Sequence, residues 1–518
     1  MILGDPHDVT AASANSIGQA TLDDLFTRAA LRRPGTVALT DPPNRRSFTD
    51  GAPRYVTYAA ADRMVTAIAG RLQHLGLAPD TVIGLQLPNT VESVLALLGV
   101  LRAGMIAAPL PLLWRRAEMV TALSRIGAKA IITGGRIGAF DHGDLAREVA
   151  AEVFSIRHVC GFGATIADGV TPLSDLFTAD KLDPLLSLGQ RHSPAAHVAI
   201  VTWDATAQGL APIARSHMEI IAGGMAILLE GRIERNATIL ASSMMGSFSG
   251  IALSVMPWLL SGGTLVLHQP FDPSVFASQC VEHCCDTVVL PGPVLPRFLE
   301  ASLLAHEGLK NVLAVWRAPE CLATSPLWRH ARAGLVDVQV YGETGLIGTR
   351  REDSGKPTPI PCGPVLAPHG AGGGVVVVEL ARTDAGTLAL RGPMVPRSPF
   401  PPGAERGDAP FLKADASGLL DTGYPCRVDT ETGTLAVTGP PAGMVSVGGY
   451  RFGLRELQNL IERAAHGATI AALPDTFLSH RLAGSAADRA AVQQALSVRG
   501  VNPLVVGAFR DRNRPKAA

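Results

Sequence analysis

The sequence has no excess of charge of either sign. Its 518 residues include 45 Lys and Arg against 45 Asp and Glu, and charged residues make up only 17% of the chain. A chain without net positive charge has no field with which to hold a phosphate backbone, so we expect no nucleic-acid partner. Hydrophobic residues reach 47%, which argues against intrinsic disorder and predicts a folded protein with a large core.

Long apolar runs are also missing. The most apolar windows are residues 94–113 and 251–268, and both are interrupted by glycine and proline. A membrane-spanning helix needs about 20 consecutive apolar residues, so we expect no membrane span. The first ten residues lack a basic segment followed by an apolar one, and we therefore expect a cytoplasmic protein.

Cysteine is scarce. The chain has seven cysteines, an odd number, and they form only one cluster. The cluster contains Cys280, Cys284, Cys285 and the neighbouring His283. These residue types can hold a metal ion. The segment is typical of one helix running into a strand, however, so the side chains would not converge from separate elements. We expect buried or neutral thiols here.

The chain does have a regular alternation of helix and strand patterns. Thr57 precedes apolar residues at helical spacing, and Gly76 ends that run. Residues 82–87 predict a buried strand, residues 91–102 a helix and residues 105–109 another strand. This alternation predicts parallel sheets covered by helices.

The C-terminal part has a different pattern. Residues 375–390 contain two β-rich runs joined by a turn, which predicts an antiparallel β-subdomain. Proline and glycine crowd residues 439–449, as in an interdomain hinge. We predict an α/β fold with a large N-terminal domain, residues 1–442, of two sheet-and-helix subdomains plus the β-subdomain. A small α+β C-terminal lid, residues 443–518, would follow.

Three segments resemble one known family. They are residues 57–116, beginning TYAAADRMV, residues 338–346, VQVYGETGL, and residues 418–462, beginning GLLDTGY and including MVSVGGYRFG. All three are similar to class I adenylate-forming enzymes, a superfamily that includes acyl- and aryl-CoA synthetases.

The resemblance implies an acyl-CoA synthetase-like protein, an acid–thiol ligase of the kind found in fatty acid metabolism. Such enzymes join a carboxylate to the α-phosphate of ATP and then transfer the acyl group from AMP to a thiol. ATP, Mg²⁺ and CoA are the implied cofactors, and a small-molecule carboxylate or acyl thioester is the implied ligand. The chemistry calls for a phosphate loop, a carboxylate on Mg²⁺, an acid on the ribose and a lysine.

Residues 201–217, VTWDATAQGLAPIARSH, correspond to the family's phosphate loop. The segment keeps the outline of that loop at Thr202, Thr206, Gly209, Pro212, Ser216 and His217. Trp203 and Asp204 stand where the family has Ser-Gly, and the loop lysine is missing. Asp204 would repel a phosphate, although backbone amides could still cradle one.

The next loop matches the family at Tyr341, Gly342 and Thr344. Gly345 stands where the family has its Mg²⁺-binding glutamate. Glu343 is therefore either the replacement metal ligand or a solvated loop carboxylate. The candidate catalytic residues implied by the resemblance are Thr206, Glu343, Thr344 and Lys516.

The remaining polar positions also depart from the family. Tyr424 replaces the ribose-binding aspartate, and Asp421 either substitutes for it or turns the loop. Arg427 either binds a phosphate or contributes to folding. Lys516 either replaces the catalytic lysine or belongs to a mobile basic tail. The nucleotide-binding candidates are Thr202, Thr206, Gly209, Tyr341, Gly342, Asp421 and Arg427.

The acyl and thiol sites are predicted by the same resemblance. Gly448, Gly449 and Tyr450 correspond to the family's route for the CoA thiol, and an ordinary β-turn is the alternative. The candidate wall of the acyl pocket consists of Met245, Phe248 and Trp316. Arg317 could pair with a substrate carboxylate or with Glu320.

Three functions follow from this degenerate active site. Loss of one charge-stabilising group typically costs about 2–4 kcal/mol in the transition state, and several such groups are replaced. The protein is a divergent ligase with altered activity, a homologue that has lost ATP-dependent adenylation and binds acyl or CoA ligands, or a non-catalytic partner.

Overall fold

The first part of the chain forms a seven-stranded sheet in the order β11-β10-β4-β3-β5-β8-β9. The computed structural model describes residues 19–179, 183–189, 191–330, 332–368, 374–407 and 410–510. The strands are β3 (Val82–Gln86), β4 (Ile106–Pro109), β5 (Ala130–Gly134), β8 (His158–Phe162), β9 (Thr171–Pro172), β10 (Val198–Thr206) and β11 (Gly209–Ser216). All neighbours are parallel except β10 and β11, which confirms the predicted parallel arrangement.

A second sheet of eight strands has the order β17-β16-β15-β14-β12-β13-β1-β2. Its strands are β1 (Val37–Thr40), β2 (Tyr55–Thr57), β12 (Thr238–Ala241), β13 (Thr264–Leu267), β14 (Thr287–Pro291), β15 (Asn311–Trp316), β16 (Gly334–Tyr341) and β17 (Gly345–Arg350). The central strands are parallel, and β2 and β17 pair antiparallel at the two edges.

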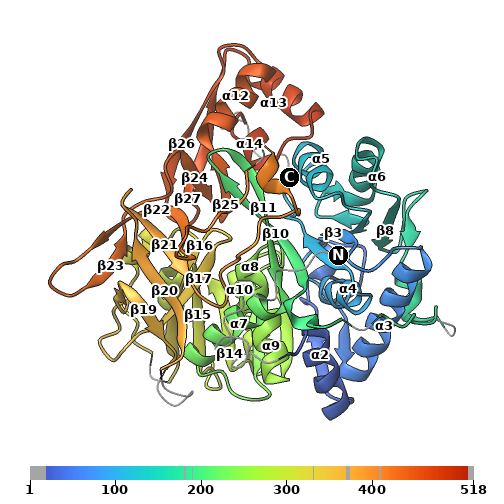
Figure 1. Cartoon of the computed structure of the whole chain (residues 1–518), viewed down its shortest axis with the longest axis horizontal. Coiled ribbons are helices and arrows are strands. Elements are labelled where there is room, and N and C mark those ends of the chain that lie inside the picture. The colour runs from blue at the N-terminus through green and yellow to red at the C-terminus, as the bar shows by residue number, and fades with distance from the viewer. Residues whose placement is uncertain are drawn as a thin grey trace.

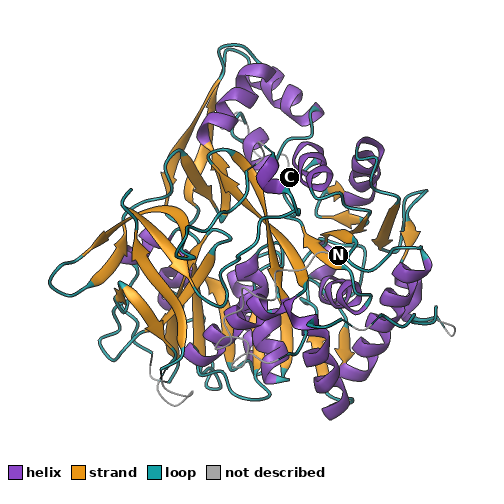
Figure 2. Cartoon of the chain, viewed as in Figure 1, coloured by secondary structure: helices purple, strands orange, loops and turns teal. Residues whose placement is uncertain are grey.

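Helices separate and cover these two sheets (Figures 1 and 2). They are α2 (Leu22–Arg32), α3 (Tyr58–His74), α4 (Val91–Arg102), α5 (Arg116–Arg125), α6 (His142–Glu152), α7 (His217–Glu230), α8 (Phe248–Leu253), α9 (Val255–Ser261), α10 (Pro273–Glu282) and α11 (Leu295–Glu300). Thr57 caps α3 as predicted, its hydroxyl accepting a hydrogen bond from the Ala60 amide at 3.3 Å. The largest apolar cluster joins α2, α3, α4, α7 and α9 with strands of both sheets, so one core fixes the two sheets together.

The third sheet is antiparallel, with the order β18-β23-β22-β21-β20-β19. Its strands are β18 (Ile360–Pro361), β19 (Gly363–Leu366), β20 (Val376–Arg382), β21 (Thr387–Arg391), β22 (Leu420–Val428) and β23 (Thr434–Val437). The hairpin of β20 and β21 is the antiparallel element predicted for residues 375–390. A two-stranded sheet of β6 (Arg136–Ile137) and β7 (Phe140–Asp141) lies in the N-terminal part.

The last described residues form a fourth sheet with helices on it. Its strands are β24 (Met444–Val447), β25 (Tyr450–Gly453), β26 (Thr469–Asp475) and β27 (Ser479–Ser485), and its helices are α12 (Leu454–Ala464), α13 (Arg489–Val498) and α14 (Pro503–Gly507). These elements share an apolar cluster of their own. That separate core supports our proposal of a domain boundary between residues 442 and 443.

The C-terminal elements rest on the N-terminal part through α5. The Asn502 amide donates to Glu118 Oε1 at 2.9 Å, and the Ala117 amide donates to the Gly500 carbonyl at 3.0 Å. Figure 1 shows the β10–β11 hairpin extending toward the same C-terminal elements. None of the described helices has the length and apolar character needed to cross a bilayer.

A buried ion pair holds the end of the second sheet. Asp337 on β16 pairs with Arg351 at 2.7 Å, and neither side chain is exposed to solvent. Asp337 Oδ1 also accepts the indole N–H of Trp316 at 2.9 Å. The pair therefore fixes the end of β15, where the wall of the site described below begins.

Replacing Asp337 with alanine should strongly destabilise the protein. Arg351 would be left as a buried charge without its counter-ion, which typically costs about 3–5 kcal/mol. Urea denaturation of the D337A variant measures the loss. The matched control is Asp353→Ala at an exposed carboxylate, for which a change within about 0.5 kcal/mol is expected. Equal midpoints for the two variants would contradict this assignment.

Candidate functional site

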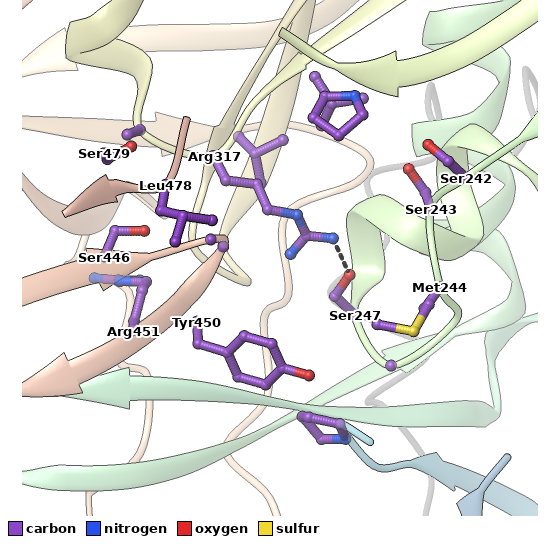
Figure 3. Close-up of a pocket in the computed structure, with 18 of the residues that line it drawn as sticks. Ser242, Ser243, Met244, Ser247, Arg317, Ser446, Tyr450, Arg451, Leu478 and Ser479 are labelled. Carbon is purple, nitrogen blue, oxygen red and sulfur yellow. Dashed lines mark hydrogen bonds between the residues drawn. The ribbon is translucent and has the colours of Figure 1, made fainter. Parts of the chain in front are cut away.

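A cavity of about 570 Å³ lies where the two parallel sheets meet the C-terminal sheet. This volume suits a small organic ligand. Much of the wall is apolar, and Trp114, Trp203, Val315 and Trp316 belong to it. The polar lining residues include Ser242, Ser243, Ser247, Arg317, Glu343, Tyr450 and Arg451 (Figure 3).

The position of the cavity follows from the sheet topology. Ser242 follows β12, Arg317 follows β15, and Gly342 follows β16, and these three strands are parallel members of one sheet. Ligands of α/β proteins bind at the carboxyl ends of such strands. The turn of Gly448 and Gly449 between β24 and β25 closes the cavity from the C-terminal side.

The segment expected to be a phosphate loop is a regular hairpin. Strands β10 and β11 stay paired up to Thr206 and Gly209, so only two residues form the turn. The Thr206 hydroxyl donates to the Gly209 carbonyl at 2.8 Å and accepts the Gln208 amide at 3.2 Å. Amides of a regular ladder point alternately to its two edges and do not converge on an anion. The expected backbone cradle for a phosphate is therefore absent from this hairpin.

Asp204 makes an ion pair that crosses the site. Its Oδ1 lies 2.6 Å from Nη1 of Arg451 on β25, with the two side chains 8% and 13% exposed. Asp204 Oδ2 also accepts the Glu343 amide at 3.0 Å. Burial alone would lower the pKa of Arg451, but the neighbouring charge of Asp204 raises it above its ordinary value.

Gly342 makes this ion pair possible. Its φ of +58° lies in the left-handed region, and a Cβ at this position would overlap both the Asp204 carboxylate and the Arg451 guanidinium. The loop after β16 thus packs directly against the pair. The expected nucleotide-binding residue Gly342 lines the cavity, and its glycine character serves an internal contact.

Glu343 is also engaged inside the protein. Its Oε2 accepts the Phe248 amide at 2.7 Å, and the side chain is buried. Burial raises the pKa of Glu343, while the positive charge of Arg215 acts in the opposite direction. The described residues contain no group of three or more His, Cys, Asp or Glu that could hold a metal ion. Glu343 is a buried acceptor in this structure, and its role as a metal ligand stays a prediction.

Arg215 is a fully buried partner of the same loop. Its Nη2 donates to the carbonyls of Glu343 and Thr344, and its guanidinium lies 3.9 Å from the centre of the Phe248 ring. Burial lowers the pKa of Arg215 to about 10. Thr344, a candidate catalytic residue, is buried and contributes its carbonyl to this contact.

Several predicted nucleotide-binding residues lie away from the cavity. Asp421 and Arg427 are exposed on β22, and Asp421 accepts the Gly423 amide at 2.8 Å, which supports the turn-forming alternative. Tyr341 is buried, donates to Gln339 at 3.1 Å, and packs its ring edge on Tyr424. Asp421, Arg427 and Tyr341 are not among the residues that line this cavity, and their nucleotide-binding roles stay predictions.

The residues predicted for the acyl and thiol sites lie partly in the wall of the cavity and partly in the apolar core. Trp316, Gly448, Gly449 and Tyr450 line the cavity, whereas Met245 and Phe248 are buried in the apolar core and belong to a different side of their segment. From the same segment, Ser242, Ser243, Met244 and Ser247 line the cavity. The acyl-pocket roles of Met245, Phe248 and Trp316 stay predictions. Thr202 is buried beneath the site, and Lys516 lies outside the described residues.

The superfamily's nucleotide groups can be compared with this geometry. The phosphate loop is a closed hairpin, Asp204 is paired with Arg451, and Glu343 is buried as an acceptor. Tyr424, which replaces the family's ribose-binding aspartate in the sequence, is buried. Asp204, Glu343 and the hairpin residues are thus engaged in contacts within the protein.

The sequence is similar to those of known enzymes. The AMP-binding enzyme family model matches residues 26–203. The 2-hydroxy-7-methoxy-5-methyl-1-naphthoate–CoA ligase of Streptomyces carzinostaticus is 27% identical over 512 residues, which cover 92% of this chain and 86% of the ligase. A salicylyl-CoA synthase / salicylate adenylyltransferase of Streptomyces sp is 26% identical over 444 residues, covering 82% and 78%.

A solved structure shows the same fold. The amide bond synthetase McbA from Marinactinospora thermotolerans covers 94% of both chains with a TM-score of 0.73 and 17% identity. The family model, the CoA-ligase relatives and the shared fold support membership of the class I adenylate-forming superfamily. Within this superfamily it is acyl- or aryl-CoA-ligase-like.

Breaking the Asp204–Arg451 pair should destabilise the protein. The R451Q variant leaves a largely buried carboxylate without its counter-ion, and a loss of about 3 kcal/mol in the free energy of unfolding is expected. Urea denaturation of R451Q, D204N and the double variant gives the coupling between the two side chains. Arg455→Gln, at an exposed arginine four residues along the chain, is the control. Additive effects of D204N and R451Q would contradict a direct interaction.

Proposed function

We propose that the chain binds the acyl or aryl part of a small carboxylic acid, as the free acid or as its thioester, and that it does so without ATP-dependent adenylation. The observation that carries this proposal is the cavity of about 570 Å³, whose wall is mainly apolar. Two charged residues of its lining, Asp204 and Arg451, are paired with each other. The CoA-ligase relatives support the acyl or aryl class of the ligand.

The lining residues have distinct roles in this proposal. Trp316 and Val315 provide apolar contact for the body of the ligand, and the hydroxyls of Ser243 and Ser247 lie along the same wall. Gly448 and Gly449 present backbone without side chains, with φ of +56° and +89°. A thiol or thioester sulfur can approach such backbone closely, so this turn is the proposed thiol side of the cavity.

The proposal leaves out the ATP half of the superfamily's reaction. A triphosphate would have to enter beside the Asp204 carboxylate, and the field of that group is neutralised only while Arg451 stays paired with it. Conventional ATP-driven ligation is the second candidate, which superfamily membership favours.

Calorimetric titration with single ligands tests the proposal. The unmodified chain should bind benzoyl-CoA, octanoyl-CoA or one of the parent acids, and should show no heat with ATP and Mg²⁺. Ser243→Phe should abolish ligand binding because the ring fills the cavity, whereas Ser485→Phe at an exposed serine should leave binding unchanged.

Each other outcome selects another function. Acid-dependent exchange of pyrophosphate into ATP would establish conventional ligation and overturn the loss of adenylation. If no acid, thioester, CoA or nucleotide binds, the proposal of a ligand-binding cavity fails and a non-catalytic partner is favoured.

A further inference from the structure

Arg317 differs from the other arginines around the cavity. It follows β15 and extends into the cavity, where its Nη2 donates to the Ser247 hydroxyl at 2.8 Å (Figure 3). Among the described residues, no carboxylate lies within ion-pair distance of its guanidinium. The alternative pairing with Glu320, which the sequence left open, is not formed.

The neighbouring largely buried arginines, Arg451 and Arg215, have their partners within the protein. Arg451 is paired with Asp204, and Arg215 donates to two backbone carbonyls beneath the Phe248 ring. Buried charged side chains are normally paired, because an uncompensated charge away from water is costly. Burial lowers the pKa of Arg317, although guanidinium groups stay protonated at neutral pH. Arg317 is thus a buried cation without an ion-pair partner among the described residues, and the charge of Glu343 acts on it only from beyond ion-pair distance.

The surroundings of Arg317 leave its donors available on the cavity side. A guanidinium has five N–H donors in a planar fork that matches a carboxylate in two parallel hydrogen bonds. Gly449 packs against the stem of the side chain, since a Cβ there would lie 2.6 Å from Arg317 Cδ. Ser247 fixes one end of the fork. The guanidinium is therefore held in place before a ligand arrives.

We propose that Arg317 is the anion-binding residue of the cavity and pairs with the carboxylate of an organic acid whose apolar body lies against Val315 and Trp316. This inference rests on the proposed ligand-binding function and specifies the chemical form that is bound. The free acid is held as its carboxylate, with Ser247 as the positioning residue of Arg317. A neutral analogue of the same shape would leave the guanidinium unpaired.

Comparing the affinities of acids with those of their amides shows whether the cavity recognises the charge of the ligand or only its shape. Benzoate, salicylate and octanoate are titrated calorimetrically into the chain alongside benzamide, salicylamide and octanamide. The best acid should bind about ten- to a hundredfold more tightly than its amide, as expected for hydrogen bonds to a charged group. Equal affinity of an acid and its amide would overturn the role of Arg317 while leaving the ligand-binding cavity in place.

Variants then assign the effect to this side chain. Arg317→Gln should weaken acid binding about tenfold or more and leave amide binding within about twofold, because only the charged contact is lost. Arg297→Gln removes an exposed arginine that also lines the cavity and should change acid binding by less than about twofold, because exposed charges are screened. If R297Q abolishes the preference for the acid and R317Q does not, the assignment is wrong.

Two further measurements distinguish a lost contact from a damaged fold. Added methylguanidinium should restore acid binding to Arg317→Ala, which a misfolded site would not allow. Ser247→Ala should reduce acid affinity and Ser247→Thr should restore it, since the hydroxyl that orients Arg317 returns. Failure of methylguanidinium in a variant with an unchanged melting temperature would count against Arg317. Binding of thioesters but of no free acid would overturn this inference and preserve the proposed function, whereas binding of neither would remove both.

Discussion

The ion pair between Asp204 and Arg451 is the contact on which the arrangement of the site depends. It connects β10 of the first sheet with β25 of the last one, and the Gly342 loop of the second sheet lies against it. One contact therefore joins three sheets at the edge of the cavity. Asp204 is unfavourable for binding a phosphate, and the same charge is favourable for holding the C-terminal elements in place, because Arg451 is largely buried with it.

Most charged residues around the cavity have partners inside the protein, and Arg317 lacks an ion-pair partner within the described part of the chain. Asp204 and Arg451 neutralise each other, Glu343 accepts the Phe248 amide close to Arg215, and Asp337 satisfies both Arg351 and the Trp316 indole. These groups are internally satisfied and have little left to offer to a ligand. Arg317 stands apart because its hydrogen bond to Ser247 leaves its charge uncompensated. A mainly apolar cavity with one buried cation of this kind suits an acid better than a polyphosphate, which needs several positive groups together.

The sequence predicted the elements that depend on local patterns. The strand at Val82–Gln86 and the helix at Val91–Arg102 were expected almost to the residue, because apolar spacing and capping residues act within a few positions. The site was less predictable. Asp204 and Arg451 are 247 positions apart, and nothing local to either residue indicates the other. The regular hairpin of residues 198–216 was likewise concealed by its outline similarity to a loop.

The acyl wall shows why a resemblance can locate a segment and still misplace its side chains. Met245 lies before α8 and Phe248 is its first residue, and both side chains are buried in the core, whereas Met244 and Ser247 line the cavity. A shift of one position changes which face a side chain occupies, and helical phase is set by packing that a single sequence does not reveal.

Persistence of the fold does not require persistence of the ATP site. The two parallel sheets are held together by a continuous apolar core of helices and strands, none of which needs a nucleotide for its stability. The cavity at the carboxyl ends of the strands is a consequence of that topology. Polar residues at its edge can therefore be exchanged while the cavity remains, provided that each new buried charge finds a partner. Asp204 and Arg451 meet this condition together, so similarity to CoA ligases at about a quarter of the positions fixes the architecture more firmly than the reaction.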